Sequence, residues 1–244
     1  MSGHSKWNNI KRKKEKTDGA RAKIFTKLGR EMAVAIKEGG PDPNSNGKLR
    51  EIIAKAKANN VPNDNIDRAI KKAMADSDKS DFYSITYEGY GLGGIAVMVE
   101  ALTDNRNRTA ADVRHYFDKY GSGLGQTGCV SYLFEQKGVL VIEDEDLTED
   151  KLMDDCLEAG AEDFTFEDGT AEITTSPADF DAVRDALMAK GYQFVSADLA
   201  YVPSTYVQLT DEDSIVKMNK LLELLDDNDD VQNVWHNWDI PEEE

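Results

Sequence analysis

The chain has few of the residues that metal sites, disulfide frameworks and many active sites require. Its 244 residues include only two cysteines and three histidines. Cys129 and Cys156 stand far apart and outside any CxxC pairing, so we expect two free, buried thiols. His4, His115 and His236 show neither metal-ligand spacing nor a nucleophile motif. These shortages argue against an enzyme and predict no bound metal and no cofactor.

Long apolar runs are missing as well. No stretch approaches the ~20 apolar residues that a membrane helix needs, and the basic N-terminus is not followed by the apolar core of a secretory signal. The sequence therefore predicts a cytoplasmic protein without a membrane span. The chain contains no GxxxxGK[ST] motif, and its glycine-rich segment at residues 89–94 precedes a strand-like run, so we expect a hairpin turn rather than a phosphate loop.

Charge is distributed very unevenly along the chain. The formal net charge is -18, yet residues 1–79 hold 19 Lys and Arg against 10 Asp and Glu, a net charge of +9. The remainder holds 10 basic and 37 acidic residues, a net charge of −27. A basic end on an acidic body attracts a polyanion through that end only.

The basic third has the pattern of a short arm followed by three helices. After Met1, the residues up to 20 carry only Trp7 and Ile10 as large apolar side chains, too little apolar surface to order the arm before it binds a ligand. From Ala20 on, apolar residues recur at helical spacing in three segments, which are separated by breaks at residues 39–43 and 59–62. These segments predict a three-helix bundle.

The rest of the chain alternates between strand-like and helical segments. Residues 138–199 follow the order strand, helix, strand, strand, helix, strand, which is the ferredoxin-like βαββαβ signature. A further strand is expected near 129–134. The elements after residue 200 are too few for a domain of their own, so we expect them to complete the unit that opens at residue 80.

The predicted fold class is therefore an α+β multidomain protein. An N-terminal three-helix bundle is followed by an α/β domain that contains an inserted ferredoxin-like βαββαβ domain. The expected domains are residues 1–79, residues 80–135 together with 200–244, and residues 136–199.

Basic side chains that lie off the apolar stripes are the candidate ligand contacts. A single lysine of this kind is normally just solvated, so the density of the set carries the argument. Phosphate neutralisation by Lys and Arg gives salt-dependent affinity without reading sequence, and Trp7 can stack on a base. A wider outward set includes Lys55, Lys57, Arg68, Lys71 and Lys72. The predicted nucleic-acid contacts are Lys6, Trp7, Lys11, Arg12, Lys13, Lys14, Arg21, Lys23, Lys27, Arg30, Arg106 and Arg108.

The segment 103–109 allows two interpretations. It leads from a strand into a helix, which places the guanidinium groups of Arg106 and Arg108 beside the free amides of a helix N-terminus, where a phosphate can bind. Alternatively, Asp104 or Asn107 caps the helix and the two arginines pair with neighbouring carboxylates. Both interpretations remain open from the sequence.

An ordered set of short motifs spans nearly the whole chain. They are Gly3-His4-Ser5-Lys6-Trp7, Asn9-Ile10-Lys11, Lys23-Ile24-Phe25-Thr26-Lys27-Leu28, Asn65-Ile66-Asp67-Arg68-Ala69-Ile70-Lys71-Lys72, Tyr87-Glu88-Gly89-Tyr90-Gly91 and the segment 103–109. With these motifs the chain closely resembles the YebC/PmpR family, which includes the mitochondrial translational activator of cytochrome oxidase. The resemblance implies a helical N-terminal domain, then an α/β domain with a ferredoxin-like insertion. It also implies a role in gene expression, either as a DNA-binding transcriptional regulator or as a translation factor at the ribosome.

The sequence thus favours a non-enzymatic nucleic-acid-binding regulator. Its expected ligand is DNA or ribosomal RNA, because phosphate contacts by Lys and Arg serve both, and the ribosome or other proteins are further expected partners. The alternative is a protein-interaction adaptor whose acidic α/β domains bind a basic protein.

Overall fold

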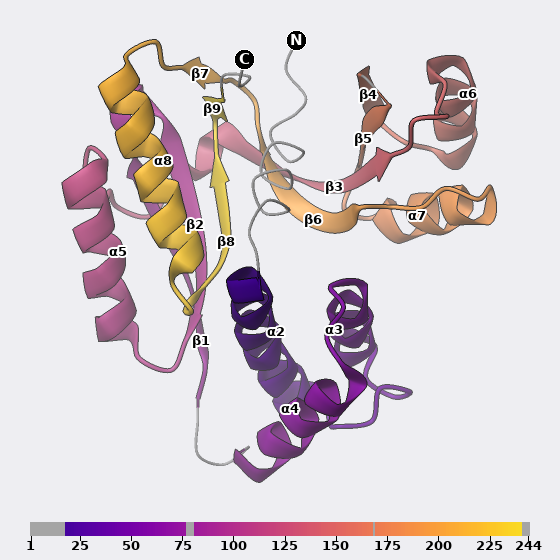
Figure 1. Ribbon diagram of the computed structural model, residues 1–244, viewed down its shortest axis with the longest axis horizontal. Helices are drawn as coiled ribbons and strands as arrows, with labels where there is room; N and C mark the ends of the chain where they lie inside the picture. Colours follow the sequence, from indigo (N-terminus) through magenta and orange to yellow (C-terminus); the bar gives the residue numbers. More distant parts are fainter. Residues whose placement is uncertain (1–17, 77–80, 168, 241–244) are drawn as a thin grey trace. The chain divides into compact units, whose positions relative to one another are not determined.

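A computed structural model describes residues 18–76, 81–167 and 169–240 (Figure 1), with the side chains of residues 18–22 and 76 left undescribed. The protein is a mixed α/β chain in which N-terminal helices precede the sheets, as the sequence predicts. Among the described residues, no helix has both the length and the apolar character needed to cross a bilayer.

The N-terminal helices are α2 (Asp18–Gly39), α3 (Gly47–Ala58) and α4 (Asn63–Asp76). Their core contains Met32, Leu49 and Ile66, all of which are buried, one from each helix. Buried Asn46 joins the first two helices: its Oδ1 accepts from the Leu49 amide, and its Nδ2 donates to the Ala35 carbonyl at 2.7 Å. The cap of α3 is thereby tied to the end of α2, which fixes the angle of the turn.

A three-stranded sheet follows the helices. Strands β1 (Tyr83–Tyr90) and β2 (Ala96–Thr103) form an antiparallel hairpin through the short 3₁₀ turn Leu92–Gly94, as the glycine-rich segment predicts. The sheet order is β1-β2-β8, where β8 (Val231–His236) is contributed by the C-terminal segment. Helices α5 (Arg106–Tyr120) and α8 (Glu212–Asp227) run side by side (Figure 1). The C-terminal elements α8 and β8 therefore belong to this part of the fold.

The prediction of a strand near residues 129–134 is wrong. This stretch contains the 3₁₀ turn Ser131–Leu133, and β3 begins only at Phe134 and runs to Glu143. The carboxylate of Glu88, which is buried, accepts hydrogen bonds from the amides of Gly128 at 2.8 Å and Val130 at 2.9 Å. Because a side chain takes these amides, they are not available for pairing with a neighbouring strand.

The second sheet has the order β4-β5-β3-β6, and its neighbouring strands are antiparallel. Along the chain its elements succeed one another as strand, helix, strand, strand, helix, strand. Leu140, Ile173 and Leu187 lie in the core between this sheet and its helices, where Cys156 is also buried, whereas Cys129 is half-buried rather than buried. The elements after β3 are α6 (Glu149–Ala159), β4 (Asp163–Glu167), β5 (Thr170–Thr175), α7 (Phe180–Ala189) and β6 (Ser196–Pro203).

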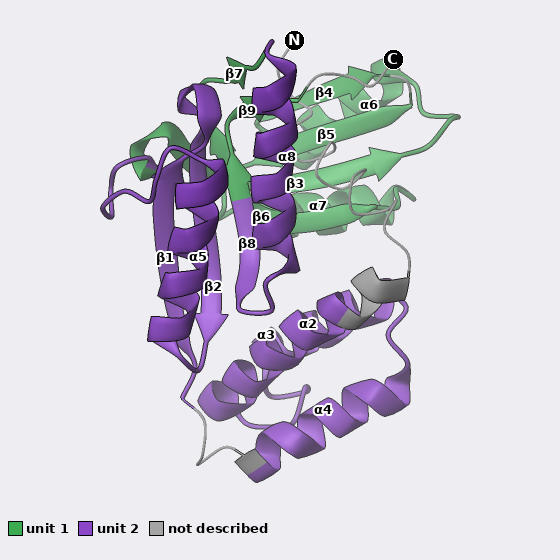
Figure 2. Ribbon diagram, turned by 60° about the vertical axis from the view of Figure 1, so that its left-hand side comes forward, with its two compact units in different colours: residues 1–11, 131–209, 235–244 green, residues 12–130, 210–234 purple. Residues whose placement is uncertain are grey.

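The described residues form two compact units (Figure 2). One holds Ser131–Leu209 and the residues from Trp235 on; the other holds the residues up to Val130 together with Thr210–Val234. In the first unit, β7 (Val207–Gln208) and β9 (Trp238–Asp239) form a short parallel pair. The three predicted domain boundaries remain a prediction.

Candidate nucleic-acid interface

The predicted contact residues fall into three groups in the structure. The side chains of Arg21 and of the six arm residues lie outside the described part of the chain. Three more lie on α2, and two lie at the start of α5. The arm residues in question are Lys6, Trp7, Lys11, Arg12, Lys13 and Lys14.

The basic residues of α2 reach an acidic turn, residues 226–230, which joins α8 to β8. Lys23 Nζ lies 2.7 Å from a carboxylate oxygen of Asp227, and Lys27 Nζ donates to the Asp226 carbonyl at 2.9 Å. A spacing of four residues places these two lysines on one face of the helix. The acidic turn therefore occupies part of the face that the sequence assigns to a polyanion.

Arg30, one turn further along α2, makes three contacts with the same region. Its Nη1 lies 2.6 Å from the Asp229 carbonyl, 2.5 Å from Asp230 Oδ1 and 3.2 Å from the Leu102 carbonyl. The Arg30 side chain is only 19% exposed. Arg30 is thus a largely buried structural cation in the described chain.

Asp230 is the centre of this network. Its side chain is 4% exposed and accepts from Arg30, from both Nε and Nη2 of Arg108, and from the hydroxyls of Thr103 and Thr109. Burial alone would raise the pKa of Asp230, but the hydrogen bonds from Thr109, Arg108 and Arg30 together hold that pKa below its usual value. Asp230 therefore stays ionised at neutral pH.

The two arginines of the segment 103–109 have different environments. Arg108 Nη2 lies 2.8 Å from Asp230 and 2.9 Å from Asp104, and these carboxylates raise the pKa of Arg108. The cap of α5 is Asn105, whose side chain accepts from the Arg108 amide, and not Asp104 or Asn107, the two residues that the second interpretation offered as caps. Arg106 instead stacks over the ring of Tyr83 at 3.9 Å.

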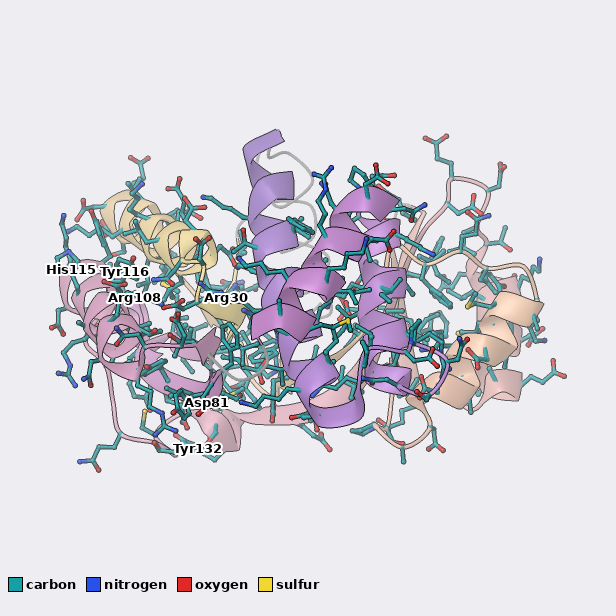
Figure 3. The ribbon with its side chains drawn as sticks, turned by 90° about the horizontal axis from the view of Figure 1, so that it is seen from below. Arg30, Asp81, Arg108, His115, Tyr116 and Tyr132 are labelled. Atoms are coloured by element: carbon teal, nitrogen blue, oxygen red, sulfur yellow. The ribbon has the colours of Figure 1, made fainter. Side chains whose placement is uncertain are left out.

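Arg30 of α2 and Arg108 of α5, both labelled in Figure 3, line an open hollow of about 390 Å³. Acidic side chains outnumber the two arginines in it, and both arginines are already engaged by Asp230. A phosphate entering this hollow would meet net repulsion from these carboxylates. The lining residues are Arg30, Asp104, Arg108, Asp112, Asp227, Asn228, Asp229 and Asp230.

The outward face of α4 carries basic side chains with no such carboxylate partners. Arg68, Lys71 and Lys72 are exposed and lie opposite the buried Ile66 and Ala73. Among the described residues none of the three forms an ion pair. The i, i+3 and i, i+4 spacing gathers the three charges on one surface, which we call the α4 basic face.

The α4 basic face was predicted to point outward but was not among the predicted contacts. The signal in the sequence was its position opposite the apolar stripe. What sequence reasoning missed is that the cations of α2, which look equivalent in the sequence, are occupied by a turn about 200 residues away.

The motif at residues 87–91 has a packing role. A Cβ atom on Gly89 would lie 2.7 Å from the ring of Phe117, and one on Gly91 would lie 2.5 Å from the sulfur of Met218. Neither distance is compatible with a normal contact. The glycines therefore let α5 and α8 pack closely against the β1–β2 hairpin.

Comparison with known proteins gives consistent matches over the chain. Residues 5–76 match the family model described as the TACO1/YebC protein N-terminal domain, and residues 82–238 match that of the TACO1/YebC second and third domain. A relative from Ruminiclostridium cellulolyticum is 59% identical over 244 residues, covering 100% of this chain and 98% of the relative. A relative from Finegoldia magna is 57% identical over 239 residues, covering 98% and 99%. Both are named probable transcriptional regulatory protein.

A crystal structure shares the fold. It is that of a conserved hypothetical protein from Aquifex aeolicus, with 44% sequence identity and a TM-score of 0.83. The match covers 93% of this chain and 94% of that one.

Proposed function

Because the chain belongs to the TACO1/YebC family, we propose that it is a non-enzymatic, nucleic-acid-binding regulator of gene expression that acts in the cytoplasm. The name shared by its bacterial relatives supports regulation. The observation that carries nucleic-acid binding is the α4 basic face, a group of exposed cations that have no carboxylate partner within the described part of this acidic protein. Its ligand is DNA or ribosomal RNA.

The α4 basic face and the arm form the phosphate-binding surface in this proposal. Lys23, Lys27 and Arg30 contribute less than the sequence suggests, because the acidic turn engages them. Cations that are exposed and unpaired lose little on meeting a phosphate, whereas paired ones must first give up an existing partner.

Charge removal on α4 tests the proposal. We expect a variant with Arg68→Gln, Lys71→Gln and Lys72→Gln to bind duplex DNA more weakly. The slope of log affinity against log salt should fall by about 2 to 3, at about 0.9 for each phosphate that the variant no longer neutralises. The measurement is a fluorescence anisotropy titration at several salt concentrations, with DNA and RNA of the same sequence.

The matched control neutralises cations that are already paired. Lys217 and Lys220 on α8 lie beside Asp213 and Glu223, so Lys217→Gln with Lys220→Gln should leave the salt slope unchanged. Equal slopes in the α4 variant, the control and the unaltered protein would remove the α4 basic face from the proposal.

Ultraviolet crosslinking in cells, followed by separate RNase and DNase digestion, identifies the ligand. Adducts that are sensitive to RNase and map to ribosomal RNA support a translational role at the ribosome. Adducts that are sensitive to DNase and lie at promoters support a transcriptional role.

We also propose that the unit from β3 to β6 is the ferredoxin-like insertion implied by the sequence. Two observations support this class: the βαββαβ succession and the order β4-β5-β3-β6 of its antiparallel strands. In the proposed function this unit serves as a surface for protein partners.

An adaptor that binds a basic protein is the second candidate function. The observation in its favour is the acidic turn, which already binds Lys and Arg side chains of this chain. Charge reversal at residues 11–14 separates the two functions: partner recruitment survives it in an adaptor and fails in a nucleic-acid-dependent regulator.

A further inference from the structure

Arg106 and Tyr83 form an exposed stack at one end of the three-stranded sheet. The guanidinium carbon of Arg106 lies 3.9 Å from the centre of the Tyr83 ring, and Tyr83 is 36% exposed. Pairing of β1 with β2 places Tyr83 opposite Thr103, just before the turn that starts α5. The hairpin register thus brings the first residue of β1 beside the first residue of α5.

Arg106 differs from Arg108, two residues further on, in whether its guanidinium group is already bound to carboxylates. Arg108 donates to Asp104 and Asp230, whereas the side chain of Arg106 makes neither an ion pair nor a hydrogen bond with the described part of the chain. Stacking on Tyr83 uses one face of the guanidinium plane. The five N–H groups point outward within that plane, so the stack leaves them available to an acceptor.

A planar cation held on an aromatic ring is a platform for an unstacked base. Bases that are splayed out of a helix stack on aromatic rings and on Arg guanidinium planes, and in-plane donors of the same Arg can contact phosphate. In a duplex the faces of the bases are covered by their neighbours. A platform of this kind therefore distinguishes unpaired from paired nucleotides.

We propose that Arg106 and Tyr83 form a binding site for an unpaired nucleotide, in which the base stacks on the guanidinium plane of Arg106 and Tyr83 holds that plane in position. This site rests on the proposed nucleic-acid function and adds the form of the ligand, a single-stranded segment. It is separate from the α4 basic face, which contacts phosphate in any form of nucleic acid.

Arg106→Lys tests the site because it keeps the charge and removes the plane. We expect its affinity for a single-stranded oligonucleotide to fall at least about fivefold, the lower end of what one base stack contributes. Its affinity for a duplex and its salt slope should not change, because the number of cations is the same. Tyr83→Leu should lower single-strand affinity in the same way, with its thermal midpoint measured to confirm folding.

Arg114→Lys is the matched control. Arg114 is exposed on the same helix, two turns further on, and has no stacking partner among the described residues. Its replacement should leave both affinities unchanged. Each titration uses the full chain with single strands of RNA and of DNA, so that any preference between the two sugars is seen directly.

The outcomes separate this site from the proposed function. An equal loss for single strands and duplexes in Arg106→Lys, or no loss at all, overturns the stacking site. If the Arg106→Lys protein binds as the unaltered protein does while the α4 triple variant loses affinity, only the stacking site fails. If the unaltered protein binds no nucleic acid, the proposed function fails with it.

Discussion

Asp230 shows how much one buried carboxylate can organise. It receives hydrogen bonds from α2 through Arg30 and from α5 through Arg108 and Thr109. Removing one partner of a buried ion pair costs more than the pair contributes, because the remaining charge is left without compensation.

We expect Asp230→Asn to lower the free energy of unfolding by about 2 to 3 kcal/mol at pH 7. This is below the usual 3–5 kcal/mol for a fully buried pair, since Arg108 is 46% exposed and is partly solvated. Urea unfolding followed by circular dichroism measures the change. The control is Asp181→Asn, which removes an exposed partner of Arg184 and should cost less than about 1 kcal/mol.

The effect of Asp230→Asn on the free energy of unfolding should depend on pH. Because the folded protein lowers the pKa of Asp230, its stabilisation is complete above the ordinary Asp pKa of about 3.9 and is lost as the pH falls through the lowered value. The difference in stability between the unaltered protein and Asp230→Asn should therefore shrink in acid. A difference that stays constant from pH 6 to pH 3 would show that the charge of Asp230 does not contribute.

At the scale of elements, the acidic turn supplies the basic face of α2 with acceptor oxygens, as a bound phosphate would. It brings backbone carbonyls and carboxylates to Lys23, Lys27 and Arg30, which lie at helical spacing on one face. Lys27 and Arg30 both donate to main-chain oxygens of the turn, so these bonds do not depend on which acidic residues occupy it.

Asp227→Asn should raise nucleic-acid affinity modestly. The Asp227 side chain is 40% exposed and holds Lys23, so its neutralisation frees one cation and removes one repulsive charge, an effect of up to about fivefold at low salt. Anisotropy titrations at two salt concentrations measure this change. The control, Asp181→Asn on α7, changes the net charge equally, and the same gain in both variants would mean that only net charge matters.

The elements also show which features the sequence could predict. The helices α2 to α4 and the β1–β2 hairpin depend on local periodicity and glycine placement, and these were predicted. No strand forms at 129–134 because Glu88 accepts hydrogen bonds from backbone amides there. Arg108 pairs with Asp230, which is 122 residues away in the sequence. Interactions at such separations leave no local pattern, so the choice between phosphate and carboxylate for Arg108 could not be made from the sequence.

At the scale of the whole molecule, charge decides how a polyanion approaches. With +9 on residues 1–79 and −27 on the rest, attraction is confined to one end of the chain. The arm carries six of the basic residues within positions 2–16, the densest group in the sequence.

Deleting residues 2–16 should weaken nucleic-acid binding strongly and flatten its salt dependence. The deletion removes six cations and one anion, and the salt slope on duplex DNA falls by about 0.9 for each phosphate left without its cation. The measurement is the same titration series used for α4. Unchanged affinity after the deletion would leave the α4 basic face as the main contact and refute a role for the arm.

The return of β8 to the sheet β1-β2-β8 has a consequence for synthesis. Strand β2 ends at residue 103 and its partner β8 begins at residue 231, whereas the sheet from β3 to β6 is complete once residue 203 has been made. During translation the second sheet can therefore close while the first still has an open edge. The earlier-made hairpin keeps one side of β2 unpaired until residues 231–236 of β8 have left the ribosome.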